Sequence, residues 1–253
     1  MDLGISGKRA LITGASMGLG FGVAEALARE GVHLVLFARN FEALNNAKVN
    51  LLQKHPDLDV QVISGDMTKA QDIRDLRQYL IDTGSIDIFI VNTARPPNPM
   101  RNFLDEDDPV RWEQAYQTQL QCALLLLREI TPMMLDRGWG RVVAIGSASV
   151  KQPMPKHALS TIFRAGLLAA LKHLSNETAG KGLTVNTVSP ASIKSDNFAA
   201  HYNLDERLKT IPMNRLGTVE ELASTVAFFC SQQAGFINGA NLQVDGGMSS
   251  ALY

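Results

Sequence analysis

The segment 13–20, with the sequence TGASMGLG, constrains the fold of this chain more than any other. Its three glycines, Gly14, Gly18 and Gly20, stand between the apolar run Arg9–Thr13 and an amphipathic stretch. Glycines at this spacing let a backbone turn approach a phosphate closely, and the free amide groups of a helix N-terminus attract negative charge. The pattern predicts a strand–turn–helix unit that binds a dinucleotide pyrophosphate; a glycine-rich turn without a ligand is the alternative.

Short apolar runs and longer helical patterns alternate along the rest of the chain. Continuously apolar runs are typical of parallel strands that are covered on both faces. We therefore expect an α/β fold, a Rossmann-type doubly wound parallel seven-stranded sheet with helices on both faces. The expected strands are 9–13, 33–37, 60–64, 86–91, 141–145, 184–188 and 241–244. The expected helices are 20–30, 41–55, 68–79, 108–136, 158–177 and 218–230, with Thr68 and Thr218 as N-caps.

Composition and linkers favour one domain over residues 1–253. Hydrophobic residues make up 45% and charged residues 19%, which is enough for a large core, and the net charge of −1 attracts neither nucleic acid nor an anionic membrane. No segment has the pattern of a signal peptide or a membrane span, so we expect a cytoplasmic protein. The segment 192–212 lacks periodicity and is predicted to be a substrate lid. The two cysteines, Cys122 and Cys230, lie in apolar stretches that are typical of core thiols.

The end of the second strand indicates which dinucleotide is preferred. Proteins that bind NAD carry a carboxylate about 20 residues after the glycines, where it binds the ribose hydroxyls. Here that position is Ala38, followed by Arg39. A guanidinium can bind a 2′-phosphate through paired hydrogen bonds, so we expect NADP(H) to be preferred over NAD(H). An exposed charge near a helix start is the alternative for Arg39.

Several segments, in order, resemble the short-chain dehydrogenase/reductase family. They are TGASMGLG, the pair Asp66–Met67, the segment 90–94 (IVNTA), the segment 186–195 (NTVSPASIKS) and a tail similar to that of 3-oxoacyl-acyl-carrier-protein reductases. The resemblance implies a homotetramer or homodimer that acts on a small-molecule or acyl-carrier-bound substrate. The cofactor contacts that it implies are Gly14, Ser16, Met17, Gly18, Leu19, Gly20, Arg39, Asp66, Met67, Asn92, Thr93, Ala94, Arg164, Pro190, Ile193 and Ser195.

The catalytic positions depart from the family pattern of Asn, Ser, Tyr and Lys. Ser147 is retained, but the tyrosine position is Ser160, the lysine position is Arg164 and the asparagine position is Gln119. The chain thus resembles a divergent subgroup with Ser and Arg in place of Tyr and Lys. In the family, a lysine lowers the pKa of the tyrosine that gives a proton to the substrate. A serine hydroxyl is a much weaker acid, and an arginine does not deprotonate.

Three other proton sources are open. Ser147 and Ser160 could hold the carbonyl oxygen while water delivers the proton. His157 lies about one helical turn before Ser160 and has a reference pKa of about 6.5; a polar residue at a helix start is the alternative. Tyr202 could close over the site or could simply pack in the lid.

The loop 94–108 contains three prolines and follows the expected fourth strand. Its two arginines, Arg95 and Arg101, could contact an anionic substrate such as a carboxylate or a phosphopantetheine. The alternative is a rigid loop with ordinary surface charges.

Three functions remain open from the sequence. The leading hypothesis is an NADP(H)-dependent oxidoreductase that acts on a carbonyl/alcohol pair with a non-standard catalytic site. The second is a non-redox isomerase, lyase or cyclase, and the third is a catalytically silent NADP(H)-binding subunit. The histidines show no ligand spacing, and no metal site is expected.

Overall fold

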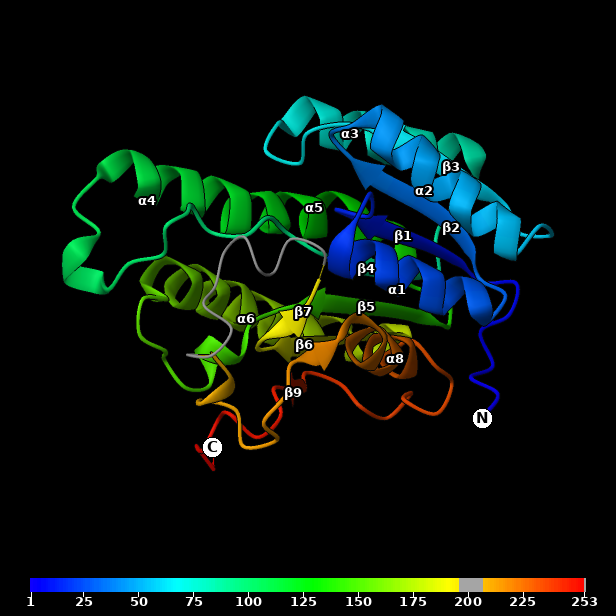
Figure 1. Ribbon diagram of the computed structural model, residues 1–253. Coiled ribbons are helices and arrows are strands. Elements are labelled where there is room, and N and C mark those ends of the chain that lie inside the picture. The colour runs from blue at the N-terminus through cyan, green and yellow to red at the C-terminus, as the bar shows by residue number, and fades with distance from the viewer. Residues whose placement is uncertain (196–206, 253) are drawn as a thin grey trace.

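A seven-stranded parallel sheet forms the centre of the structure (Figure 1), a computed structural model that describes residues 1–195 and 207–252. The strand order is β3-β2-β1-β4-β5-β6-β9, so the chain reverses its direction of travel between β1 and β4. The strands are β1 (Arg9–Thr13), β2 (His33–Ala38), β3 (Val60–Ser64), β4 (Ile88–Val91), β5 (Gly140–Ile145), β6 (Leu183–Pro190) and β9 (Asn241–Val244). In such sheets, ligands bind outside the carboxyl ends of the strands at the reversal point.

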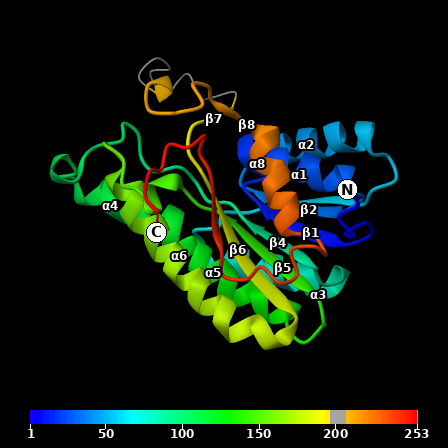
Figure 2. The same cartoon turned by 90° about the horizontal axis from the view of Figure 1, so that it is seen from below.

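Helices cover both faces of the sheet (Figures 1 and 2), and each face has its own buried apolar cluster. One face carries α1 (Gly18–Arg29), α2 (Phe41–Lys54) and α8 (Val219–Phe229). The other carries α3 (Ala70–Thr83), α5 (Cys122–Ile130) and α6 (Ala158–Thr178), with α4 (Pro109–Ala115) leading into α5. Side chains along each strand alternate between the two clusters, as the twofold period of a strand requires. The predicted doubly wound fold is confirmed.

Shorter elements connect this framework. A second, two-stranded sheet pairs β7 (Ile193–Lys194) with β8 (Gly217–Thr218) beyond the end of β6. The 3₁₀ turns are Phe103–Asp105, Thr131–Met134, Ala148–Val150 and Ala179–Lys181. Among the described residues, no helix has the length and apolar character needed to cross a membrane.

The predicted long helix over 108–136 is present as a continuous helical segment from 109 to 134, but it is not a regular α-helix throughout. A π-helical turn, Tyr116–Gln121, separates α4 from α5, and the last part is the 3₁₀ turn Thr131–Met134. Pro132 explains the second change, because it has no amide hydrogen to continue an α-helix. The π-helical turn leaves no mark in the apolar pattern, but such turns are frequent at functional sites.

Two helix starts also differ from the prediction. α1 begins at Gly18, inside the glycine-rich segment, and α3 begins at Ala70. Thr68 is not an N-cap, because its amide and hydroxyl both donate to Asp66 Oδ1, at 3.0 and 2.8 Å. Thr218 caps α8 as predicted, in a capping box with Glu221.

The two cysteines are core residues, as predicted. Cys122 lies in α5 and Cys230 follows α8, and both side chains are buried. Burial raises the pKa of each thiol to about 12, so both stay protonated and unreactive at neutral pH.

Candidate active site

The three glycines of the turn between β1 and α1 have different structural roles. A Cβ atom on Gly20 would collide with the carbonyl oxygen of Gly14, and one on Gly14 would lie 2.8 Å from Asn92 Nδ2. A Cβ on Gly18, which has a φ of +59°, would meet nothing within 4 Å. Two glycines are therefore required by packing, while the space above Gly18 is open for a phosphate at the N-terminus of α1.

Asn92 fixes the shape of this turn. Its amide donates to Thr13 Oγ1 at 2.9 Å, and the Thr13 hydroxyl donates to the Asn92 carbonyl oxygen at 2.9 Å. Its side-chain amide donates to the Gly14 carbonyl oxygen at 3.2 Å. Asn92 therefore ties the end of β4 to the glycine-rich turn. Its direct contact with the cofactor stays a prediction.

Charged groups gather at the far end of the expected dinucleotide site. Arg39 is exposed after β2 and directly precedes Asn40, which caps α2. Burial raises the pKa of Asp66, but the hydrogen bonds from Thr68 and the charges of Arg39 and Lys69 outweigh it and hold that pKa below its usual value. The Asp66 carboxylate is therefore ionised and available to accept hydrogen bonds, and Arg39 stands where an extra phosphate could be bound.

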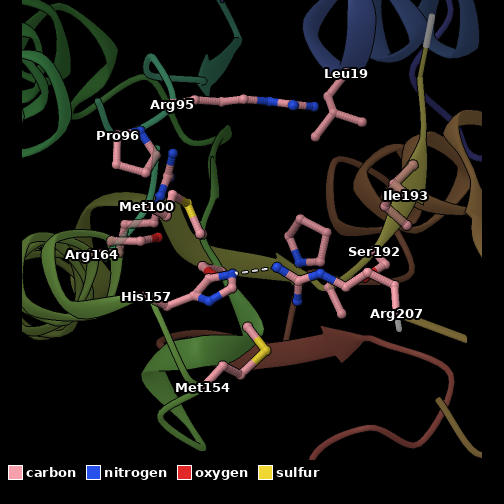
Figure 3. Close-up of a pocket in the computed structure, with 15 residues that line it drawn as sticks. Leu19, Arg95, Pro96, Met100, Met154, His157, Arg164, Ser192, Ile193 and Arg207 are labelled. Carbon is pink, nitrogen blue, oxygen red and sulfur yellow. Dashed lines mark hydrogen bonds between the residues drawn. The ribbon is translucent and has the colours of Figure 1, made fainter. Parts of the chain in front are cut away.

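A pocket opens at the carboxyl ends of the strands (Figure 3). Its wall contains Ser147, Ser160 and Arg164, the three positions that correspond to the family's catalytic serine, tyrosine and lysine. The same wall contains Leu19 from the glycine-rich segment and Ile193 from β7. The structure therefore brings Ser147, Ser160 and Arg164 and part of the predicted cofactor site into one cavity.

The Ser147 hydroxyl belongs to a short chain of hydrogen bonds. Ser147 caps the 3₁₀ turn Ala148–Val150, and its Oγ lies 2.9 Å from Ser149 Oγ and 3.3 Å from the Ser149 amide nitrogen. If the buried Ser149 hydroxyl donates to Ser147, the hydrogen of Ser147 can point toward a ligand. Sequence reasoning missed Ser149, although the S-x-S spacing could have indicated it.

Arg164 connects two strand ends at the base of the pocket. Its Nη1 donates to the Ile145 carbonyl oxygen at 2.8 Å, and its Nη2 donates to the Ala94 carbonyl oxygen at 3.2 Å. The residue is only 8% exposed. A lysine could not bridge both carbonyl groups with the same planar geometry, so this substitution changes the architecture of the site as well as its acidity.

His157 is held in a neutral form. Its Nδ1 lies 2.8 Å from the Pro155 carbonyl oxygen, and its Nε2 lies 3.2 Å from Arg207 Nη2 (Figure 3). Burial, together with the nearby charge of Arg207, lowers the pKa of His157 to about 4. The partners assign the proton to Nδ1, leaving Nε2 as an acceptor. This arrangement works against His157 as a general acid at neutral pH.

Gln119, unlike the other predicted catalytic residues, does not line the pocket. Gln119 is fully buried on the π-helical turn, and neither of its amide atoms has a hydrogen-bond partner among the described residues. Tyr202 and the central part of the predicted lid lie outside the described residues, although Ser192 and Arg207 at its edges line the pocket. Within residues 1–195 and 207–252, no cluster of His, Cys, Asp or Glu is arranged to hold a metal ion.

The reversal point of the sheet, the glycine-rich turn and the adjoining pocket define a Rossmann-type dinucleotide-binding protein. Residues 14–249 match the family model described as enoyl-(acyl carrier protein) reductase. The chain belongs to the short-chain dehydrogenase/reductase family.

Known relatives match over nearly their whole length. The chain is 32% identical over 251 residues to 2,3-dihydroxy-2,3-dihydro-p-cumate dehydrogenase of Pseudomonas putida, covering 97% of this chain and 95% of that one. It is 30% identical over 249 residues to 3-oxoacyl-(acyl-carrier-protein) reductase FabG of Salmonella typhimurium, covering 97% and 99%. The structure of L-sorbose reductase from Gluconobacter frateurii, complexed with NADPH and L-sorbose, matches all of both chains with a TM-score of 0.92 at 28% identity.

Proposed function

We propose that this protein is an NADP(H)-dependent oxidoreductase that interconverts a carbonyl and an alcohol without a tyrosine proton donor. The observation that carries the proposal is that Ser147 and Ser160 line the same pocket as Leu19 and Ile193. The relatives named as dehydrogenases and reductases support redox chemistry, and the NADPH complex of L-sorbose reductase supports the cofactor.

The residues present fit a dinucleotide. The open space above Gly18 suits a pyrophosphate, Arg39 suits a 2′-phosphate, and Asp66 is ionised to accept hydrogen bonds from the adenine. Ile193 and Ser195 would contact the nicotinamide carboxamide. When bound, the cofactor supplies or accepts the hydride.

The serines provide the substrate contacts in this proposal. Ser147, supported by Ser149, and Ser160 donate hydrogen bonds to the substrate oxygen and stabilise the charge that develops on it. Both serines act as neutral donors that keep their protons, and the proton that the product oxygen gains comes from solvent water. Arg164 keeps the strand ends, and with them the pocket, in place.

Stopped-flow mixing of NADPH-loaded protein with a panel of ketones and 3-ketoacyl thioesters tests the proposal. We expect loss of the nicotinamide absorbance with at least one substrate, and a lower rate in Ser147→Ala. If the protein bound NADPH but transferred no hydride to any substrate of the panel, the proposal would be refuted.

A second candidate function follows from Arg164. Its guanidinium donates hydrogen bonds to two backbone carbonyl groups and so holds the strand ends together. It does not supply the proton relay that the family's tyrosine and lysine form. That arrangement suits a protein that retains the cofactor for structure, either as a non-redox enzyme or as a silent subunit. Turnover without a change in nicotinamide absorbance supports the first, and co-purification with an active homologue supports the second. Strict consumption of NADPH by the pure protein excludes both.

A further inference from the structure

We propose that Arg95 is a cofactor-binding residue whose guanidinium holds the dinucleotide pyrophosphate from the side opposite the glycine-rich turn. This inference rests on the dinucleotide of the proposed function and adds a residue that the family resemblance does not supply. The sequence grouped Arg95 with Arg101 as contacts for an anionic substrate; the structure separates the two.

The position of the Arg95 side chain is the first argument. It extends across the pocket with its guanidinium directed toward Leu19 (Figure 3). Its Nη2 donates to Ser195 Oγ at 3.3 Å. The guanidinium therefore lies between the glycine-rich segment and the segment after β6, and the space above Gly18 is open to receive a phosphate.

The charge of Arg95 is the second argument. Its described hydrogen bond goes to a neutral hydroxyl, and among the described residues no carboxylate forms an ion pair with it. The first turn of α1 contains no acidic residue. Arg101, by contrast, pairs with Asp107 at 3.4 Å. A pyrophosphate would supply the counter-charge that the described protein groups do not, through charge-assisted hydrogen bonds.

The backbone that carries Arg95 is well fixed. The carbonyl oxygen of the preceding Ala94 accepts a hydrogen bond from Arg164. Further along the loop, Arg111 and Glu106 form a buried salt bridge, with 2.8 Å between Arg111 Nε and Glu106 Oε2. Arg111 also donates to the Pro99 carbonyl oxygen at 2.6 Å. A guanidinium on a fixed backbone loses little freedom when a ligand binds, so its contacts contribute more fully to affinity.

The test measures binding rather than activity. Isothermal titration compares wild type with Arg95→Gln for three ligands: NADPH, NADH and 2′-AMP, of which 2′-AMP has no pyrophosphate. We expect Arg95→Gln to weaken both dinucleotides by about 10-fold or more, as the loss of a charge-assisted hydrogen bond implies, and to leave 2′-AMP unchanged. Arg95→Lys, which retains the charge, should recover most of the affinity.

Two further variants test whether the loss of affinity is specific to Arg95 and to the pyrophosphate. Arg39→Gln should weaken NADPH and 2′-AMP but not NADH, which is the complementary pattern. Arg101→Gln removes a charge from the same loop and should leave all three affinities unchanged.

Three results would overturn the inference. They are wild-type affinity of Arg95→Gln for both dinucleotides, an equal loss for all three ligands, and a raised KM for a carbonyl substrate with NADPH affinity intact. The proposed function fails separately: a protein that binds NADPH through Arg95 but never transfers a hydride would refute the oxidoreductase and leave the pyrophosphate contact standing.

Discussion

At the scale of single residues, the replacement of the family's tyrosine and lysine by Ser160 and Arg164 dominates the chemistry. Ser160 is a neutral donor in the pocket wall, and Arg164 is bonded to the backbone at Ile145 and Ala94. Neither side chain exchanges a proton near neutral pH. If the proposed function holds, we expect proton delivery to limit the rate of the reaction.

Restoring the family pair should relieve that limit. In the double variant Ser160→Tyr/Arg164→Lys, we expect hydride transfer to become about 10²–10⁴-fold faster, the usual contribution of a positioned general acid. The variant should also acquire a pH-dependent rate, while the wild-type rate should stay flat between pH 6 and pH 9 because none of the described residues that line the pocket is an acid with a pKa in that range. Single-turnover rates across this range measure both effects. A wild-type rate higher than that of the double variant, with a steep pH dependence, would indicate a proton donor outside the described residues.

His157 should make the stability of the fold sensitive to acid. Its pKa is lowered from 6.5 to about 4 in the folded state, so the unfolded chain binds a proton at a higher pH than the folded chain does. The stabilisation is complete above pH 6.5 and is lost as the pH falls toward 4. His157→Gln should reduce the loss in the free energy of unfolding between pH 7 and pH 4.5 by about 2 kcal/mol. Urea unfolding at pH 7 and pH 4.5 measures this loss, and an identical loss in both proteins would contradict the assignment.

At the scale of elements, the cofactor site depends on how closely α1 and α8 approach. A Cβ atom on Gly22, in the middle of α1, would collide with Cγ1 of Val219 at the start of α8. Val219 has little freedom to rotate, because β-branched side chains are stiff in helices. The N-terminus of α1 carries the glycine-rich turn, so the packing of α8 sets the position of the phosphate site.

Gly22→Ala should therefore lower both stability and NADPH affinity. We expect the free energy of unfolding to fall by about 1–3 kcal/mol, the usual cost of overpacking, and NADPH binding to weaken because α1 shifts. Gly180→Ala is the matched control, because a Cβ there meets nothing within 4 Å. Chemical denaturation and titration with NADPH give the two readouts. A Gly22→Ala protein as stable as the control would show that the two helices are free to separate.

At the scale of the whole molecule, one face presents α5 and α6 side by side (Figure 2). Ile162, on α6, is 39% exposed. The predicted homotetramer would pack through the helices around 108–136 and 158–177, and such a face would be buried in it.

Light scattering after size exclusion should give four times the mass of the chain. Ile162→Asp should shift the protein toward smaller species, because it would place a charge in an apolar contact. Val49→Asp is the control: Val49 is 46% exposed but lies on α2, on the opposite face of the sheet. A monomer in the wild type, or equal dissociation in both variants, would contradict this assembly.

Local patterns were enough to predict the sheet and most of its helices. The apolar runs gave β1, β3 and β9 with the observed bounds, because a strand buried on both faces has a nearly continuous apolar sequence. The spacing of Gly14, Gly18 and Gly20 predicted the turn, since each glycine meets a local steric or conformational demand. Thr218 and Glu221 marked the start of α8 through a capping box, which is also a local interaction.

Only the tertiary structure decided what several of these residues contact. His157 lies against Arg207 and Arg95 lies against Ser195, and both partners are at least 50 residues away in the chain. Hydrogen-bond partners, burial and charge set the pKa of a side chain and its contacts, and sequence spacing does not determine them. The sequence by itself determined a dinucleotide-binding fold with an altered catalytic set. Only the folded chain shows that Arg164 donates hydrogen bonds to two backbone carbonyl groups and that the Arg95 side chain extends across the pocket.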